Sequence, residues 1–216
     1  MELYGNETYV DVDLLIPAKH DNSLATLDEF YYKIKDCQKC SLANSRTNFV
    51  FGCGNPNAKL MCIGEAPGYE EDKQGEPFVG PAGELLNKIL DAIGFRREEV
   101  YIANVIKCRP PNNRDPEVNE IVSCFGYLQK QIELIKPALI LALGKIAAQS
   151  LLGTDNSLAK LRTSANNFSG IPVVVTYHPA ALLRNQQWKH AAWEDVKKLR
   201  RMYDKIVGDK PEIMLK

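Results

Sequence analysis

The chain has 216 residues, of which 45% are hydrophobic and 25% are charged, so it can form a packed core and is not expected to be globally disordered. Lysine plus arginine equals aspartate plus glutamate, at 27 each, so net charge neither favours nor excludes a nucleic-acid partner. No apolar run approaches the roughly 18 residues of a membrane span, and the first ten residues do not resemble a secretory signal. We therefore expect a cytoplasmic, monomeric protein with no membrane partner.

The N-terminal part of the chain divides into an extension and a first helix. Residues 1–23 have no sustained hydrophobic periodicity and are interpreted as an N-terminal extension. Ser23 is expected to cap a helix whose apolar face is formed over residues 24–34 and which leads into Cys37.

The rest of the chain alternates apolar strands with helices. Strands are predicted at residues 59–64, 100–105, 138–143 and 172–177, and helices at residues 81–93, 116–135, 144–152 and 187–207. Strands that are apolar throughout are typical of a parallel sheet covered on both faces. The sequence predicts an α/β fold, a three-layer αβα arrangement around a central four-stranded parallel sheet, in a single domain over residues 24–216.

Ligand sites in such folds lie at the carboxyl ends of the strands. Here the first strand runs into the turn Gly64-Glu-Ala-Pro-Gly, the second carries Asn104, and the fourth is followed by His178. We therefore expect these residues to converge on one rim of the sheet.

The chain has six cysteines, Cys37, Cys40, Cys53, Cys62, Cys108 and Cys124. In a reducing compartment they are not expected to form disulfides. The C-x₂-C pair Cys37 and Cys40, together with Cys108 and Cys124, supplies four thiolates for zinc or an iron–sulfur cluster, and the spacing leaves that choice open. The alternative, that all six are small buried hydrophobes, suits Cys53 and Cys62 but suits the C-x₂-C pair poorly.

Three segments together resemble the iron–sulfur, thermostable class of uracil-DNA glycosylases, usually called family 4. They are GEAPGYEEDKQGEPFVGPAGELL at residues 64–86, NVIKCRPPNNRDP at residues 104–116 followed by Cys124, and HPAALLR at residues 178–184. The match extends from about residue 24 to residue 207. The resemblance implies the fold of these enzymes and a monofunctional glycosylase for base-excision repair. Such an enzyme flips uracil out of single- or double-stranded DNA, hydrolyses its N-glycosidic bond and leaves an abasic site.

The resemblance also implies a [4Fe–4S] cluster on Cys37, Cys40, Cys108 and Cys124. It further implies a uracil pocket made by Gly64, Glu65, Ala66, Phe78, Asn104 and His178. In this pocket the three residues of the first turn border the base, and the Phe78 ring stacks on it. The Asn104 amide, which has both a donor and an acceptor, reads the Watson–Crick edge, and His178 donates to uracil O2 as negative charge develops there.

A carboxylate is needed to orient the attacking water. Other members of the superfamily have an aspartate at the position of Ala66, and resemblance to relatives with the longer motif favours Glu71 as the water-activating residue. Glu65 is a further catalytic candidate, and Asp72 is expected to support the loop. A solvated acidic loop is the alternative, and it suits Glu70 best.

The segment after His178 is predicted to hold the DNA. Leu182 or Leu183 is expected to fill the gap that the flipped base leaves, and Arg184 to contact phosphate. Ala180 stands where the motif more commonly has serine, so one hydroxyl contact to DNA is missing. A basic rim is expected from Lys107, Arg109, Arg114, Lys145, Arg162 and Arg184.

Three other functions fit parts of this pattern. A sister enzyme of the same fold could prefer hypoxanthine or another deaminated base. A covalent uracil-trapping relative carries a basic insertion that is missing between Asn104 and Pro110. A non-catalytic iron–sulfur or zinc DNA-binding module would bind DNA and release no base.

Overall fold

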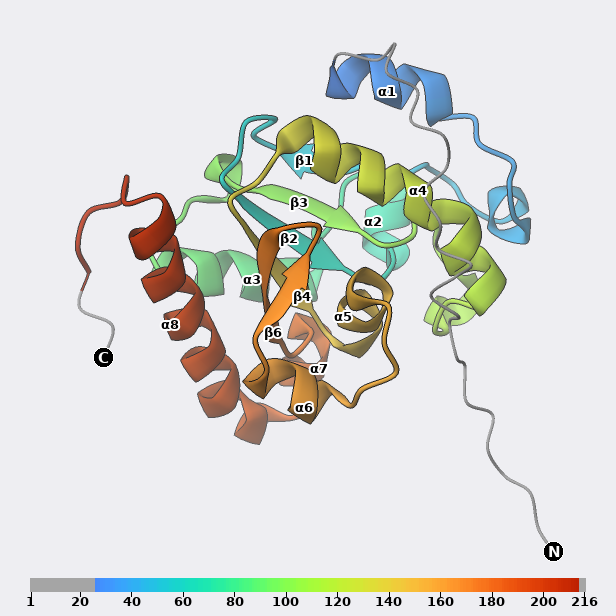
Figure 1. Ribbon diagram of the computed structural model, residues 1–216. Helices are drawn as coiled ribbons and strands as arrows, with labels where there is room; N and C mark the ends of the chain where they lie inside the picture. The colour runs from blue at the N-terminus through green and yellow to red at the C-terminus, as the bar shows by residue number, and fades with distance from the viewer. Residues whose placement is uncertain (1–25, 214–216) are drawn as a thin grey trace, which may run out of the picture.

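The computed structural model describes residues 26–213, in which six strands form one sheet (Figure 1). The strands are β1 (Cys53–Gly54), β2 (Leu60–Gly64), β3 (Tyr101–Asn104), β4 (Leu139–Leu143), β5 (Asn166–Phe168) and β6 (Ile171–Thr176), in the order β1-β3-β2-β4-β6-β5. Strands β3, β2, β4 and β6 pair in parallel. Their carboxyl ends therefore meet at one edge of the sheet.

The prediction of a four-stranded, all-parallel sheet was incomplete. Two short edge strands, β1 and β5, pair antiparallel with β3 and β6 respectively and make the sheet mixed. Strand β1 has two residues and β5 has three, so neither is long enough to show a hydrophobic period in the sequence.

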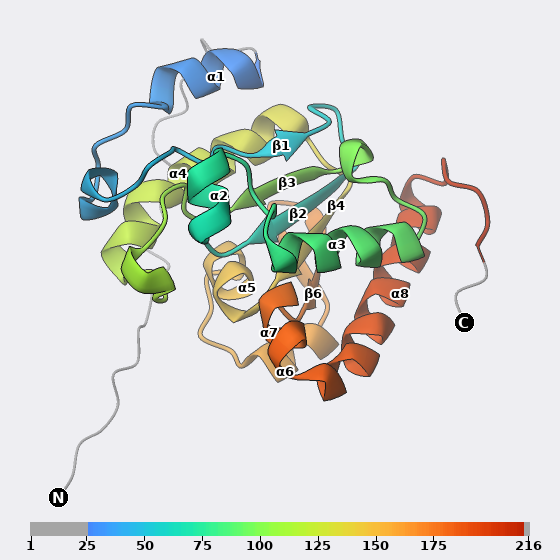
Figure 2. The ribbon, with the colours of Figure 1, turned by 180° about the vertical axis from the view of Figure 1, so that it is seen from behind.

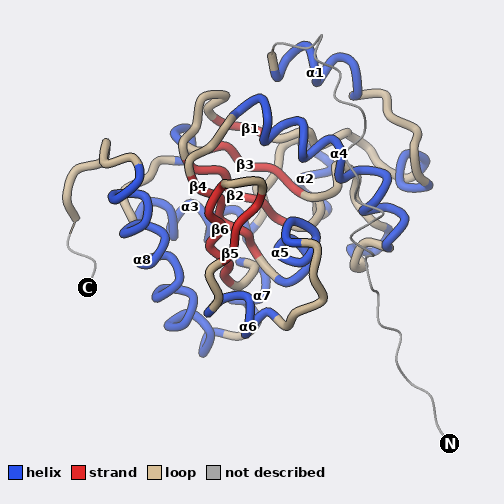
Figure 3. Tube along the Cα trace, viewed as in Figure 1, coloured by secondary structure: helices blue, strands red, loops and turns tan. Residues whose placement is uncertain are grey.

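Helices cover both faces of this sheet. In the described residues they are α1 (Leu27–Ile34), α2 (Tyr69–Gln74), α3 (Pro81–Ala92), α4 (Val118–Ile135), α5 (Lys145–Leu152), α6 (Leu158–Thr163), α7 (Pro179–Arg184) and α8 (Lys189–Ile206). Within residues 26–213, four 3₁₀ turns are also present, at Ser41–Asn44, Arg97–Glu99, Pro111–Asn113 and Gln186–Trp188. Figure 3 shows the strands as one central layer with helices on either side.

Alternating strand residues build two separate cores, because successive side chains point to opposite faces of the sheet. On one face, Met61 and Ile63 of β2 pack with α4, α5 and α6. On the other, Leu60 and Cys62 pack with α3 and α8, which Figure 2 shows covering the sheet from behind. This is the predicted three-layer αβα arrangement.

Four helices differ from the sequence prediction. Helix α1 begins at Leu27, because Thr26 accepts a hydrogen bond from the Glu29 amide and the Glu29 carboxylate accepts one from the Thr26 amide. Helices α2 and α7, six residues each, were predicted as loops, and no element was predicted where α6, also six residues long, is found. In α7, His178 is the N-cap and Pro179 the first helical residue, a position that favours proline.

The predicted N-terminal extension over residues 1–23 lies outside the described residues. The prediction that Ser23 caps the first helix is wrong, because the N-cap of α1 is Thr26. In residues 26–213, no helix is both long enough and apolar enough to span a bilayer.

Candidate active site

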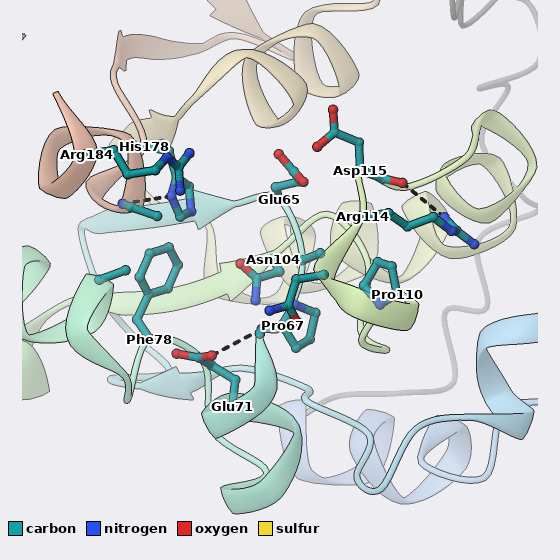
Figure 4. A pocket seen from close by; sticks show the side chains of 15 residues that line it. Glu65, Pro67, Glu71, Phe78, Asn104, Pro110, Arg114, Asp115, His178 and Arg184 are labelled. Atoms are coloured by element: carbon teal, nitrogen blue, oxygen red, sulfur yellow. Dashed lines mark hydrogen bonds between the residues drawn. The ribbon is translucent and has the colours of Figure 1, made fainter.

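A cavity of about 320 Å³ opens where β2, β3 and β6 end (Figure 4). Asn104 from β3, His178 after β6, and Glu65 to Gly68 after β2 all line it. The opposite walls are Glu71 and Phe78 from the segment after β2, and Pro110 with residues 113–115 from the loop after β3. The predicted convergence of the three strand ends on one pocket is therefore confirmed.

Gly64 and Asn104 are paired neighbours at the ends of β2 and β3. A Cβ on Gly64 would lie 2.5 Å from Asn104 Oδ1 and 2.6 Å from the Phe78 ring, so only glycine leaves room for both side chains. Asn104 is 2% exposed, and its Oδ1 is buried without a hydrogen-bond partner. A buried acceptor without a partner is costly, and here it lies at the cavity, where a ligand N–H can satisfy it.

Lys107 supports the backbone behind Asn104. Its Nζ donates to the Asn104 carbonyl at 2.8 Å and to Gln131 Oε1 at 2.6 Å, and burial lowers the pKa of Lys107 to about 8. Lys107 is fully buried, so its predicted place in a basic rim is wrong. This role could not be predicted from the sequence, because the partner Gln131 lies on α4, far along the chain.

Phe78 is held in an unusual backbone conformation. Its φ of +54° is in the left-handed region, which a bulky residue rarely adopts. Arg97 donates to the Pro77 carbonyl at 2.6 Å and to the Phe78 carbonyl at 3.1 Å, and Gly83 lets helix α3 approach the Phe78 backbone closely. These contacts fix the Phe78 ring against the cavity. Sequence reasoning did not identify Arg97.

His178 presents a defined tautomer to the cavity. Its Nδ1 accepts a hydrogen bond from the Ala180 amide at 3.2 Å, so the proton of the neutral ring is on Nε2. Burial, followed by the charge of Arg184, lowers the pKa of His178 to about 4, although Glu71 opposes this shift. Near neutral pH the ring is therefore uncharged, and Nε2 is its donor.

The Glu71 carboxylate joins two loops at the cavity wall. Oε1 accepts from the Val79 and Gly80 amides, both at 3.0 Å, and Oε2 accepts from the Gly68 amide at 3.1 Å. A carboxylate has about four acceptor positions, so these three bonds leave about one, on Oε2, for a ligand or water. Glu71 therefore has a fixed position and can accept about one further hydrogen bond.

The other acidic residues of this segment differ in their surroundings. Burial, assisted by Asp115, raises the pKa of Glu65 to about 7. Asp72 is buried and accepts from the Thr47 and Asn48 amides at 2.8 and 3.2 Å, which confirms that it supports a loop. Ala66 lines the cavity and carries no polar group.

Helix α7 presents different side chains inward and outward. Leu182 is 2% exposed and packs toward α3 and α8, whereas Leu183 is 45% exposed. Burial leaves Leu182 unable to reach DNA without a change in the packing of α7, so the structure does not support it as the wedge. Leu183 faces solvent, and Arg184 and Ala180 line the cavity.

Only part of the predicted basic rim is present. Arg114 lines the cavity, but its guanidinium is paired with buried Glu120 at 2.6 Å. Arg162 is paired with Asp195 at 2.6 Å and lies over the Tyr177 ring, away from the rim. Of the residues predicted to form the rim, Arg184 also lines the cavity.

Four cysteines gather beside this site. Cys37 follows α1, Cys40 begins the first 3₁₀ turn, Cys108 follows β3, and Cys124 lies on α4. None of the four forms a disulfide within the described residues. Burial raises the pKa of Cys108, and nearby Cys40 and Cys37 raise it further against the opposing effect of Arg46, so the two pairs lie within electrostatic range of each other.

Hydrogen-bond donors surround these sulfurs. Arg46 Nη1 donates to Cys108 at 3.2 Å, the Lys107 amide to Cys124 at 3.3 Å, and the Tyr127 hydroxyl to Cys37 at 3.2 Å. Such donors stabilise thiolates. Within residues 26–213, no group of three or more histidine, cysteine, aspartate or glutamate side chains has the arrangement of a single-ion site.

The remaining cysteines are separate from this group. Cys62 is fully buried in β2, as predicted, and burial raises the pKa of its thiol to about 12. Cys53 is only half-buried, and its sulfur accepts from Arg97 at 3.3 Å.

Comparison with known proteins matches residues 51–197 to the uracil DNA glycosylase superfamily. The chain is 44% identical to the type-4 uracil-DNA glycosylase of Archaeoglobus fulgidus, over 82% of this chain and 92% of that protein. It is 45% identical to the type-4 enzyme of Saccharolobus solfataricus, over 81% of this chain and 85% of that protein. A type-5 uracil-DNA glycosylase of Pyrobaculum aerophilum is 30% identical, over 60% of this chain and 64% of that protein.

Proposed function

Because the chain belongs to the uracil-DNA glycosylase superfamily and, within it, to the type-4 enzymes, we propose that it excises uracil in DNA repair as a monofunctional hydrolase. The substrate is uracil-containing DNA, single- or double-stranded, and the product is an abasic site. The target nucleotide leaves the stack, and its base enters the cavity between Phe78, Asn104 and His178. That the enzyme acts as a cytoplasmic monomer stays a prediction.

The observation that carries this proposal is the unsatisfied Oδ1 of Asn104. Uracil presents an N3–H donor beside its O4 acceptor, and the Asn104 amide offers the complementary acceptor and donor. Cytosine has an unprotonated N3 and an amino group, so it would leave Oδ1 facing the wrong partner. The Phe78 ring supplies a stacking surface that any base can use, which leaves selectivity to Asn104.

His178 is proposed to stabilise the leaving group. As the C1′–N1 bond breaks, the bonding pair goes to uracil and negative charge grows on O2. The Nε2–H of neutral His178 donates to O2, and this bond strengthens as the charge grows. Because the pKa of His178 is about 4, the ring stays neutral through the whole neutral range of pH.

Glu71 is proposed to orient the nucleophilic water. The acceptor position left on Oε2 receives one water proton, so the water oxygen is directed toward C1′. The carboxylate also stabilises positive charge on the sugar. The water oxygen forms the new bond to C1′, its proton leaves to solvent or uracil, and the base departs as uracil. Glu65 borders the uracil base, and its carboxyl group is protonated or ionised according to pH. We retain Glu65 as a catalytic candidate.

Contacts to the DNA strand are proposed for α7. Leu183 projects from the surface beside the cavity and fills the gap left by the extruded nucleotide. Arg184 lies at the cavity rim, where it meets the phosphates on either side of that nucleotide.

We also propose a [4Fe–4S] cluster on Cys37, Cys40, Cys108 and Cys124. Each thiolate of such a cluster binds a different iron atom, so the four sulfurs need not converge on one point as they do around zinc. The donor set of four free thiols with N–H and O–H groups directed at the sulfurs fits this cofactor. Its contribution would be structural, because these cysteines tie α1 and α4 to the segment that follows Asn104.

The proposal is tested with labelled oligonucleotides that carry one uracil or one hypoxanthine. We expect free uracil and an intact strand that breaks only after alkali, with little release of hypoxanthine. Strand breakage without alkali would contradict the monofunctional assignment, and faster hypoxanthine release would favour the sister enzyme. DNA binding with no base release by folded, cluster-loaded protein would favour the non-catalytic module.

A further inference from the structure

We propose that Tyr69 and Arg109 form a platform at the cavity mouth that stacks on one unpaired base next to the extruded uracil. This inference rests on the proposed function, since it assumes that a DNA strand crosses the mouth. It adds a binding site for a second nucleotide of that strand, made by residues that take no part in holding the uracil.

Tyr69 is exposed where an aromatic ring has no packing role. The residue is 56% exposed, at the start of α2 and directly after Gly68, which lines the cavity. Exposed large hydrophobic residues are few in the described part of the chain: Tyr32, Tyr69, Leu183 and Ile206. Two of these four, Tyr69 and Leu183, adjoin cavity-lining residues.

Arg109 holds the Tyr69 ring in place. The guanidinium carbon lies 5.0 Å from the ring centroid, and Nε donates to Asn113 Oδ1 at 2.7 Å. Within the described residues, the Arg109 guanidinium makes its hydrogen bond through Nε. Nη1 and Nη2 are therefore available to a ligand. An ordered ring beside an unpaired cation matches the two parts of a nucleotide, its base and its phosphate.

The loop that carries Arg109 is stiff. Pro110 and Pro111 have restricted φ angles, and Asn112 and Asn113 both adopt left-handed conformations, with φ of +54° and +53°. Pro110 and Asn113 also line the cavity. The platform is therefore built on the cavity wall itself and keeps a fixed distance from the uracil position.

The loop that carries Arg109 lies across the mouth from α7. Figure 4 shows His178 and Arg184 on one side of the cavity, and Pro110 and Arg114 on the other. A strand that places its uracil between these sides has a neighbouring nucleotide at each. In a duplex the neighbouring base stays stacked and paired, so its face is not available. The platform is therefore selective for single-stranded DNA.

The test is single-turnover uracil release from single-stranded and duplex oligonucleotides, which separates the half-saturating enzyme concentration from the maximal rate. For Tyr69→Ala on single-stranded DNA we expect the half-saturating concentration to rise on the order of tenfold, within the range measured for base–aromatic stacking, with the maximal rate unchanged. On duplex DNA we expect less than about a twofold change. Tyr69→Phe keeps the ring and should behave as the wild type. Tyr32→Ala is the matched control, because Tyr32 is another exposed tyrosine beside a lysine, on a helix that lines no part of the cavity.

A substrate change completes the test. Each nucleotide beside the uracil is replaced in turn by an abasic analogue. At one of these two positions the replacement should weaken wild-type binding by the same factor as Tyr69→Ala, and should cause no further loss in that variant. Equal binding by Tyr69→Ala and the wild type, or additive losses at both positions, would overturn the platform. Wild-type protein that releases no uracil would instead refute the proposed function.

Discussion

The Phe78 and His178 rings lie 5.5 Å apart between centroids, with an angle of 31° between their planes, although they come from segments on opposite sides of β4 in the chain. The φ of +54° at Phe78 and the position of His178 as the N-cap of α7 bring them to the same cavity. Together with Asn104, which also lines the cavity, they form a slot. Phe78 supplies a stacking surface, His178 a hydrogen-bond donor and Asn104 an amide.

Gly64→Ala is expected to reduce excision without unfolding the protein. The added Cβ would lie 2.5 Å from Asn104 Oδ1 and 2.6 Å from the Phe78 ring, so both must move. A displacement of this size should lower kcat/KM on the order of 10²-fold and cost about 1–3 kcal/mol of stability. Kinetics and urea denaturation measure the two effects. Gly126→Ala is the control, because nothing lies within 4 Å of its added Cβ, and activity should not change.

Glu71→Gln is expected to lower the rate of bond cleavage by at least about 10²-fold. The amide has one acceptor oxygen, so its NH₂ group must face either the Gly68 amide or the Val79 and Gly80 amides. Loss of stability of about 1–3 kcal/mol should accompany the change. The single-turnover rate at saturating enzyme, with the folded fraction measured in parallel, separates the two effects. Glu70→Gln, whose nearest partner is Gln74 at 3.5 Å, should keep the wild-type rate. A cleavage rate in folded Glu71→Gln within a few-fold of wild type would remove Glu71 from the mechanism.

Glu65→Gln is expected to stabilise the protein at neutral and alkaline pH. Because the folded pKa of Glu65 is about 7 and the ordinary value is 4.5, the folded state keeps a proton that the unfolded state releases as pH rises between these values. The wild type therefore loses stability over this window relative to the glutamine variant, by at most about 3 kcal/mol above pH 7. Urea denaturation at pH 5, 6, 7 and 8 measures the difference, which should be small at pH 5. A difference that does not grow with pH would refute the raised pKa.

The four parallel strands and the polar residues at their ends could be predicted because both depend on local sequence. Apolar runs of four to six residues identified β2, β3, β4 and β6, and parallel pairing then placed Gly64, Asn104 and His178 at one edge. The edge strands and the short helices α2, α6 and α7 were not predicted, because segments of two to six residues do not develop a recognisable period.

The supporting contacts could not be predicted, because they join residues that are distant in sequence. Arg97 holds the Phe78 loop from beyond α3, and Lys107 reaches Gln131 on α4. Both are charged residues in ordinary positions of the sequence, where a solvated side chain is the usual interpretation. The choice between Leu182 and Leu183 likewise required the orientation of α7, which the sequence alone did not define.

Cys124→Ser is expected to remove the cluster, while Cys62→Ser should retain it. Both thiols are buried, but only Cys124 lies in the group with Cys37, Cys40 and Cys108. Loss of a thiolate ligand should abolish the broad visible absorption of the cluster and reduce the bound iron from four atoms per chain. Iron analysis and absorption of the anaerobically purified variants measure this. A Cys124→Ser protein with full iron content, or a colourless wild type, would contradict the assignment.

The central claim is that the cavity reads uracil through Asn104, and a crystal structure with free uracil tests it most directly. We predict that the base lies on the Phe78 ring, with N3 about 2.9 Å from Asn104 Oδ1 and O2 facing His178 Nε2. Asn104→Ala should lose this complex under the same conditions while remaining folded. Uracil bound at another surface, or bound in this cavity with N3 directed away from Asn104, would contradict the account.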